Sequence, residues 1–240
     1  MRRRLFPLFL LLPVALYVGA ANAELGWLNV DALHPNNYPF TLHYFNYNDH
    51  NWHYDYNVGG GWMAARWNGA HISPLFCVDI YSTFSIPAGW QANRQWVPPD
   101  PPSPPPFDTA DLSYIYYNYA NSWENDPDWA QAIQLAMWEI SQEADPVNGY
   151  DWRHGYDSHT WMTSGNFQVA GGASAVYAHA TEVLDGIQGG PLGGRHIWWY
   201  QPTSGYGQGL LGDDIPEPSS LCLLGVLIIG SAGVAWRKRR

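Results

Sequence analysis

Lysine, cysteine and basic side chains in general are scarce in this 240-residue chain. It has 11 basic residues against 21 acidic ones, and a single lysine, Lys238, in the C-terminal basic cluster. The shortage of positive charge excludes nucleic-acid binding as a main role, because a net negative surface repels phosphate. Only 13% of the residues are charged, but 16% are aromatic, and aromatic side chains at that density favour a compact fold over disorder.

The first 23 residues have the three-part layout of a secretory signal peptide. A basic triplet at positions 2–4 precedes an apolar run at 5–17, and Ala21, Asn22 and Ala23 form a small-x-small cleavage site. The alternative, a membrane anchor, is disfavoured because the apolar run is short for a bilayer. We expect cleavage after residue 23 and export of the rest of the chain.

The last residues, 215–240, combine three features in a fixed order. The triplet Pro216, Glu217 and Pro218 is followed by an apolar segment at 221–236 and by four basic residues. This tail resembles the PEP-CTERM sorting signal of exported proteins in exopolysaccharide-producing Gram-negative bacteria. The resemblance implies transient anchoring in the inner membrane by a short transmembrane helix, cleavage by an exosortase-type transpeptidase, and delivery to the cell surface or extracellular matrix. A permanent single-span anchor is the alternative.

Between these ends we expect one globular domain over residues 24–214. It keeps four of the 11 basic residues and 20 of the 21 acidic ones, which gives a net charge of −16. Cationic or amine-bearing partners are therefore favoured. The domain has one cysteine, Cys77, because Cys222 lies in the apolar tail segment. A lone thiol in an exported domain is either a buried small hydrophobe or a reactive, modified residue.

Hydrophobic patterning predicts an α+β fold with an antiparallel, barrel-like sheet and a few packed helices. Alternation of apolar and polar residues predicts strands over 38–67, with a break at the three glycines 59–61, and further strands over 74–81 and 196–200. Seven prolines within 98–106 predict an extended crossing. Capping residues and helical periodicity predict helices that begin near Asp108, at Pro127 and near Gly172.

Two of these elements carry residues with candidate chemistry. Cys77 lies in the strand 74–81, whose alternation places Asp79 on the same face. Gln134 lies in the helix from Pro127, about 100° round the axis from the buried Ile133.

Cys77 within Phe-Cys-Val-Asp and Gln134 within Ile-Gln-Leu-Ala-Met-Trp together resemble the thioester domains of bacterial surface adhesins. In that family an aromatic residue or Leu precedes the Cys, and apolar residues surround the Gln at fixed positions. The resemblance spans residues 58–187. It implies a Cys77–Gln134 thioester that acylates an amine on a surface or matrix protein. The bond would be shielded by the aromatic and apolar residues of the two motifs, namely Phe76, Met137 and Trp138.

The residue types fit that chemistry. A Cys thiol can attack the Gln carboxamide, and a thioester is a far stronger acyl donor than the amide it replaces. The predicted domain has no lysine that could consume the acyl group, although a general bias against lysine would have the same effect. Asp79 or His71 could assist proton transfer. No cofactor is implied, and a single-use acyl donor is not an enzyme in the turnover sense.

Two other functions compete with this interpretation. One is a metal site, because four potential ligands are close in sequence: Asp49, His50, His53 and Asp55. Strand alternation places these side chains on opposite faces, and no second ligand pair is evident. The other is non-covalent carbohydrate or matrix binding through exposed aromatic residues, with Cys77 unreactive. Its candidate residues are Trp52, Trp62, Trp198 and Trp199.

Overall fold

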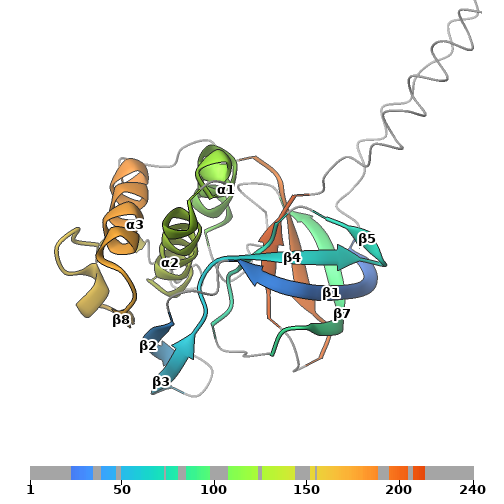
Figure 1. The fold of residues 1–240 in the computed structure, drawn as a ribbon, viewed down its shortest axis with the longest axis horizontal. Coiled ribbons are helices and arrows are strands. Elements are labelled where there is room, and N and C mark those ends of the chain that lie inside the picture. The colour runs from blue at the N-terminus through green and yellow to red at the C-terminus, as the bar shows by residue number, and fades with distance from the viewer. Residues whose placement is uncertain are drawn as a thin grey trace, which may run out of the picture.

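The computed structural model describes residues 23–34, 39–46, 50–72, 74–80, 85–97, 108–123, 126–143, 152–154, 156–188, 195–204 and 208–213. Two antiparallel sheets and three α-helices pack around one hydrophobic core (Figure 1). The predicted α+β class is confirmed. Residues 1–22 of the predicted signal peptide, the proline-rich crossing and the C-terminal tail lie outside the described residues. Among those that are described, no helix has the length and apolar character needed to cross a bilayer.

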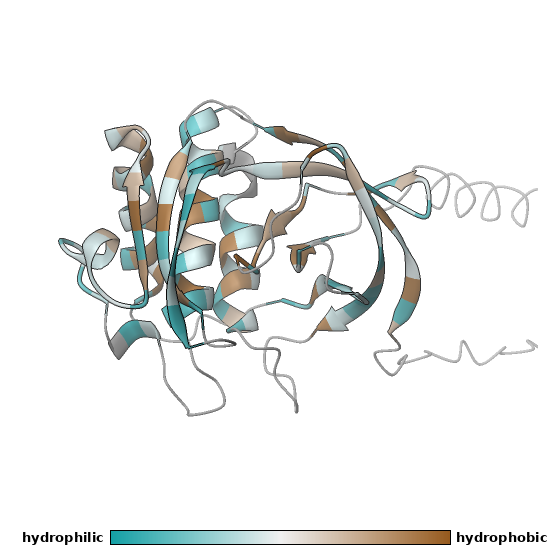
Figure 2. Cartoon of the chain, turned by 90° about the horizontal axis from the view of Figure 1, so that it is seen from below, coloured by the Kyte–Doolittle hydropathy of each residue, from teal (hydrophilic) through white to brown (hydrophobic). Residues whose placement is uncertain are grey.

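The larger sheet curls strongly without closing into a barrel (Figure 2). An isolated bridge between Met63 and Leu75 brings the two edges of the sheet close together, with N–H···O distances of 2.7 and 3.0 Å. Its seven strands are, in spatial order, β5 (Ala70–His71), β4 (Trp62–Trp67), β1 (Glu24–His34), β7 (Ala88–Val97), β9 (Ile197–Pro202), β10 (Leu210–Gly212) and β6 (Phe76–Cys77).

In Figure 1 the smaller sheet lies below α2 and α3, beside the larger sheet. Its order is β3 (Asn51–Val58), β2 (Phe40–Asn46) and β8 (Phe167–Gly171), so β3 and β8 are its edges. The register between β2 and β3 shifts by one residue near the end of β3, where Asn57 has a φ of 59°. Such a bulge turns the end of a strand and redirects its side chains.

Three helices complete the fold: α1 (Thr109–Trp123), α2 (Pro127–Glu143) and α3 (Ser174–Ile187). Two short 3₁₀ turns, η1 (Trp152–His154) and η2 (Trp161–Thr163), precede β8. The predicted helix starts are close to those observed. The carboxylate of Asp108 accepts a hydrogen bond from the Asp111 N–H at 3.1 Å, and that of Asp126 accepts one from the Asp128 N–H at 2.9 Å, as N-cap residues do.

Helix α2 is the centre of the molecule. It packs against α1 on one side, against α3 on the other, and against β6 and β8. Every residue from Ala130 to Glu143 is buried, so the one-sided apolar stripe predicted from the sequence is only part of its buried surface. Polar side chains of α2, Gln134 among them, are therefore enclosed within the protein.

The strand predicted over 74–81 is much shorter in the structure. Only Phe76 and Cys77 belong to a ladder, because their partner β10 has three residues. The Val78 N–H still donates to the Gly209 carbonyl at 3.0 Å, but the segment then leaves the sheet. Cys77 consequently lies on the last strand of the sheet, directly against α2.

Candidate functional site

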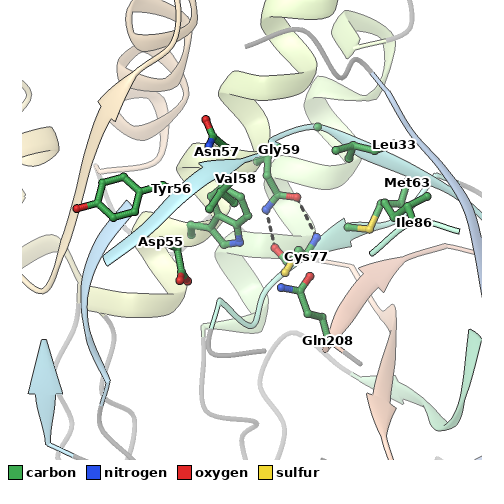
Figure 3. A pocket seen from close by; sticks show the side chains of 13 residues that line it. Leu33, Asp55, Tyr56, Asn57, Val58, Gly59, Met63, Cys77, Ile86 and Gln208 are labelled. Atoms are coloured by element: carbon green, nitrogen blue, oxygen red, sulfur yellow. Dashed lines mark hydrogen bonds between the residues drawn. The ribbon is translucent and has the colours of Figure 1, made fainter. Parts of the chain in front are cut away.

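The side chain of Gln134 is held against the main chain of Cys77 by two hydrogen bonds (Figure 3). The Cys77 N–H donates to Oε1 of Gln134 at 2.9 Å, and Nε2 of Gln134 donates to the Cys77 carbonyl oxygen at 2.6 Å. Both residues are only 1% exposed. The two bonds fix the plane of the carboxamide and hold its carbon atom beside Cys77.

This contact joins residues 57 positions apart in the sequence. Cys77 is positioned by pairing with Leu210 of β10, and Gln134 by the packing of α2 against β6. Gln134 has no other hydrogen-bond partner among the described residues. A buried amide needs partners for both its donor and its acceptor, and here Cys77 supplies them both.

The thiol of Cys77 is neutral at physiological pH. Burial raises its pKa to about 12, and the nearby Asp79 carboxylate acts in the same direction. The thiol donates a hydrogen bond to the main-chain oxygen of Asp79, with a sulfur–oxygen distance of 3.0 Å. A chemical step at this sulfur must therefore begin from the protonated form.

The indole of Trp138 lies on the same helix, one turn after Gln134. Its side chain is 2% exposed, and its Nε1–H makes no hydrogen bond of normal geometry to any described residue. The indole nevertheless favours the ionised form of the Cys77 sulfur and opposes part of the increase in its pKa. Trp138 thus places an uncommitted N–H donor close to the thiol.

A cavity of about 410 Å³ gives access to Cys77 and Gln134. One wall comes from the end of β3 and the glycine-containing turn that follows it, and Figure 3 shows Asp55, Val58 and Gly59 of this wall on one side of Cys77. The cavity is lined by Leu33, Asp55, Tyr56, Asn57, Val58, Gly59, Gly61, Met63, Cys77, Ile86, Gln134, Trp138 and Gln208.

Four other residues singled out for the thioester site do not line this cavity: Phe76, Met137, Asp79 and His71. Phe76 is fully buried and contacts Tyr116 edge to face, with ring centroids 6.3 Å apart, and Met137 is buried in the core. Asp79 contributes its main-chain oxygen to the thiol. His71 is exposed on β5, where it pairs with Arg66 of β4.

The aromatic residues proposed for carbohydrate binding have different environments. Trp52 is 44% exposed. Trp62 stacks on His34, and Trp198 and Trp199 are packed partly into the core. Sequence reasoning did not single out Tyr54 and Tyr56, which are 58% and 70% exposed and follow Trp52 at alternate positions of β3. Together Trp52, Tyr54 and Tyr56 form an exposed row, which we call the β3 aromatic row.

The potential metal ligands do not form a cluster in the part of the chain that the structure describes. No group of three or more His, Cys, Asp or Glu side chains is placed there to hold a metal ion. Asp49 lies outside the described residues. Asp55, one of the four candidates, instead lines the cavity described above.

Comparison with known proteins gives two findings. Residues 214–240 match the PEP-CTERM protein-sorting motif. This confirms the motif predicted from Pro216, Glu217 and Pro218, and it marks an exported protein that is sorted to the cell surface through the membrane. The structure is similar to the N-terminal thioester domain of the fibronectin-binding protein SfbI from Streptococcus pyogenes, with a TM-score of 0.39 and 16% sequence identity, over 78% of this chain and 98% of that one. No curated protein matches the chain.

Proposed function

We propose that the exported domain is a covalent attachment module, in which Cys77 and Gln134 form an internal thioester that acylates an amine on a surface or matrix protein. The observation that carries the proposal is the pair of hydrogen bonds that holds the Gln134 carboxamide against Cys77. Groups held in this way react as if at very high concentration. A buried Cys that served only for packing would not need the carbonyl and the NH2 group of one Gln side chain as hydrogen-bond partners for its main chain.

Formation of the thioester needs no outside reagent. The Cys77 sulfur attacks the carboxamide carbon, the C–N bond breaks, and the thiol proton leaves with the nitrogen as ammonia. Negative charge develops on Oε1 during the attack, and the Cys77 N–H that already donates to this oxygen at 2.9 Å stabilises it. The Trp138 N–H stabilises charge on the sulfur.

Acyl transfer is the second step. An amine attacks the Gln134 carbonyl carbon, the C–S bond breaks, and the sulfur recovers a proton, so the partner becomes linked through an amide bond. Burial of both residues limits hydrolysis before the partner arrives. The cavity of about 410 Å³ admits the attacking amine. Because each domain reacts once, it acts as a single-use acyl donor.

The test is the intact mass of a purified domain spanning residues 24–214. A thioester lowers the mass by about 17 Da, the mass of the ammonia that is lost, and methylamine should restore the mass and add to it. Cys77→Ala and Gln134→Ala should each give the full sequence mass and no adduct. A wild-type domain of full sequence mass that never gains methylamine would reject the proposal.

A second function is favoured by the β3 aromatic row. Exposed aromatic rings in a line can bind a carbohydrate or protein surface without covalent chemistry. Under this hypothesis Cys77 and Gln134 have a structural role only. Retention of matrix material by a Cys77→Ala domain, together with its loss in a Trp52→Ala and Tyr54→Ala double variant, would support it.

The C-terminal motif adds a processing step to either function. We propose that the chain is held transiently at the inner membrane, and that an exosortase-type transpeptidase cleaves it near Pro216–Pro218 before the domain reaches the surface or matrix. Export and cleavage precede the encounter with any partner. The expected product is a domain that ends close to residue 214.

A further inference from the structure

Asp55 is the one charged side chain among the described residues that line the cavity over Cys77 and Gln134. It lies on β3, opposite Leu42 of β2, and is half-buried. The rest of the lining is neutral, and Tyr56, also a lining residue, is 70% exposed and therefore marks the side that opens to solvent. A single carboxylate in such a space creates a local site for a positive charge.

One oxygen of the Asp55 carboxylate is held by a hydrogen bond, and this bond orients the group. The Tyr44 hydroxyl donates to Oδ2 of Asp55 at 2.9 Å. Oδ1 accepts no hydrogen bond from the described residues. Asp55 can therefore receive a further N–H donor while its position is maintained by Tyr44.

The arginines of the domain do not neutralise Asp55. Arg66 pairs with Asp31 at 2.6 Å, Arg94 with Glu24 at 2.5 Å, and Arg153 with Asp111 at 2.5 Å. Arg195 lies over the ring of Tyr117, 5.2 Å from its centroid. The chain has no lysine between residues 24 and 214. Among the described residues, therefore, neither an arginine nor a lysine supplies a cation to Asp55.

We propose that Asp55 is the ammonium-binding residue of the cavity, and that it selects a cationic primary amine such as a lysine side chain over neutral nucleophiles. This inference rests on the proposed thioester. The flexible stem of a lysine can pass Tyr56 and lie against the apolar lining, with its charged end at Asp55. The amine then enters the cavity that contains the Gln134 carbonyl group.

Asp55 also accepts a proton during the proposed acyl transfer. An ammonium ion has no free electron pair, so the carboxylate first takes one of its protons. The neutral amine attacks the Gln134 carbonyl carbon, and the C–S bond breaks with its electron pair on sulfur. That sulfur takes a second proton from the nitrogen, which leaves an amide, a Cys77 thiol, and one proton on Asp55 to be released to solvent.

The experiment compares two small amines of similar size. Methylamine is cationic at neutral pH, whereas methoxyamine is neutral. The rate of mass gain should fall at least about tenfold for methylamine in Asp55→Asn, which corresponds to about 1.4 kcal/mol, and should change less than about twofold for methoxyamine. Glu182→Gln, which removes one negative charge from the exposed side of α3, should leave both rates unchanged.

The salt dependence of the wild-type rates provides a test that does not depend on whether the Asp55→Asn variant folds. Added salt should slow methylamine and leave methoxyamine unaffected, because screening weakens only the attraction of the cation. Equal losses for the two amines in Asp55→Asn, or no loss for either, would overturn the role of Asp55 while the thioester stands. A wild-type domain without the loss of about 17 Da would overturn both proposals together.

Discussion

Gln134 and Trp138 lie one turn apart on α2 and line the same cavity, which places an amide and an uncommitted indole N–H beside the Cys77 sulfur. Residues four positions apart on a helix share a face, so this arrangement follows from the helix geometry once α2 is buried. A Phe at position 138 would keep an aromatic ring in a smaller share of this space, but it would not offer a donor.

Trp138→Phe therefore separates packing from chemistry. The variant should fold, but its aminolysis by methylamine should be about tenfold slower, because one donor to the reacting sulfur is lost. Trp161→Phe is the matched control: its Nε1–H donates to the Thr181 hydroxyl at 3.0 Å, away from the cavity. The control should lose about 1 kcal/mol of stability and keep the wild-type rate. Equal rates in the wild type and both variants would show that the Trp138 N–H has no part in the reaction.

Gln134→Ala tests how the fold protects the thiol. Without Gln134 the domain should have its full sequence mass and a free Cys77. Iodoacetamide should still react slowly at about pH 8 and at the normal rate after denaturation, because Cys77 is 1% exposed and burial raises its pKa to about 12. Fast modification of the folded variant would contradict a buried, protonated Cys77 thiol.

Glu139→Gln should change the pH dependence of stability. Glu139 is 2% exposed, and its Oε2 has no hydrogen-bond partner among the described residues. Burial and the charge of Glu143 raise its pKa well above the ordinary value of 4.5. Between the unfolded and folded pKa values the folded state binds more protons, so stability is highest on the acidic side of this window and falls as the pH rises through it.

Thermal unfolding at about pH 5 and pH 8 measures this effect. The wild type should be less stable at pH 8, and Glu139→Gln should recover about 1–3 kcal/mol there and flatten the difference. Part of the slope will remain, since burial also raises the pKa of Asp111 to about 6. A variant with the wild-type slope would show that Glu139 does not contribute to it.

Gly165→Ala should destabilise the turn before β8. Gly165 has a φ of +77°, and an added Cβ would lie 2.3 Å from Oε1 of Glu143, the carboxylate oxygen that accepts the Phe167 N–H at 2.9 Å. Gly69→Ala is the matched control, because its φ is +87° but no atom lies within 4 Å of the added Cβ. Gly69→Ala should lose about 1–2 kcal/mol from its backbone conformation alone. Chemical denaturation should show a larger loss for Gly165→Ala, and equal losses would mean that Glu143 moves freely.

The sequence predicted α2 well, because Asp126 and Pro127 mark its start and apolar periodicity marks its length. It did not predict β1 or β7. In β1 the exposed face carries the apolar residues Leu25 and Trp27, and the buried face carries Leu28 and Val30, so apolar and polar residue types do not alternate along the sequence. Strand β1 pairs with β4 on one side and with β7 on the other, and both pairings join residues far apart in the sequence, so a local pattern does not contain them.

The same limit applies to the site. Cys77 and Gln134 could be paired in advance only through the family resemblance, since 57 residues separate them. Asp55 and Tyr56 belong to a different sheet, and a register shift at the end of β3 turns that segment towards the cavity. The residues next to Asp55 in the sequence therefore did not indicate the role that we propose for it.

The position of β10 determines where an external force on the C-terminus would enter the domain. This strand is the last of the fold, it holds β6 and Cys77 in place, and the chain leaves it at Asp213, one residue before the sorting motif begins. In a domain tethered through its C-terminus and bound to a partner at Gln134, tension would enter at β10 and leave at α2. The direct path between these points runs through the two-residue β6, and β10 pairs on its other side with β9, so an external pull would load these two short ladders and the Cys77–Gln134 contact first.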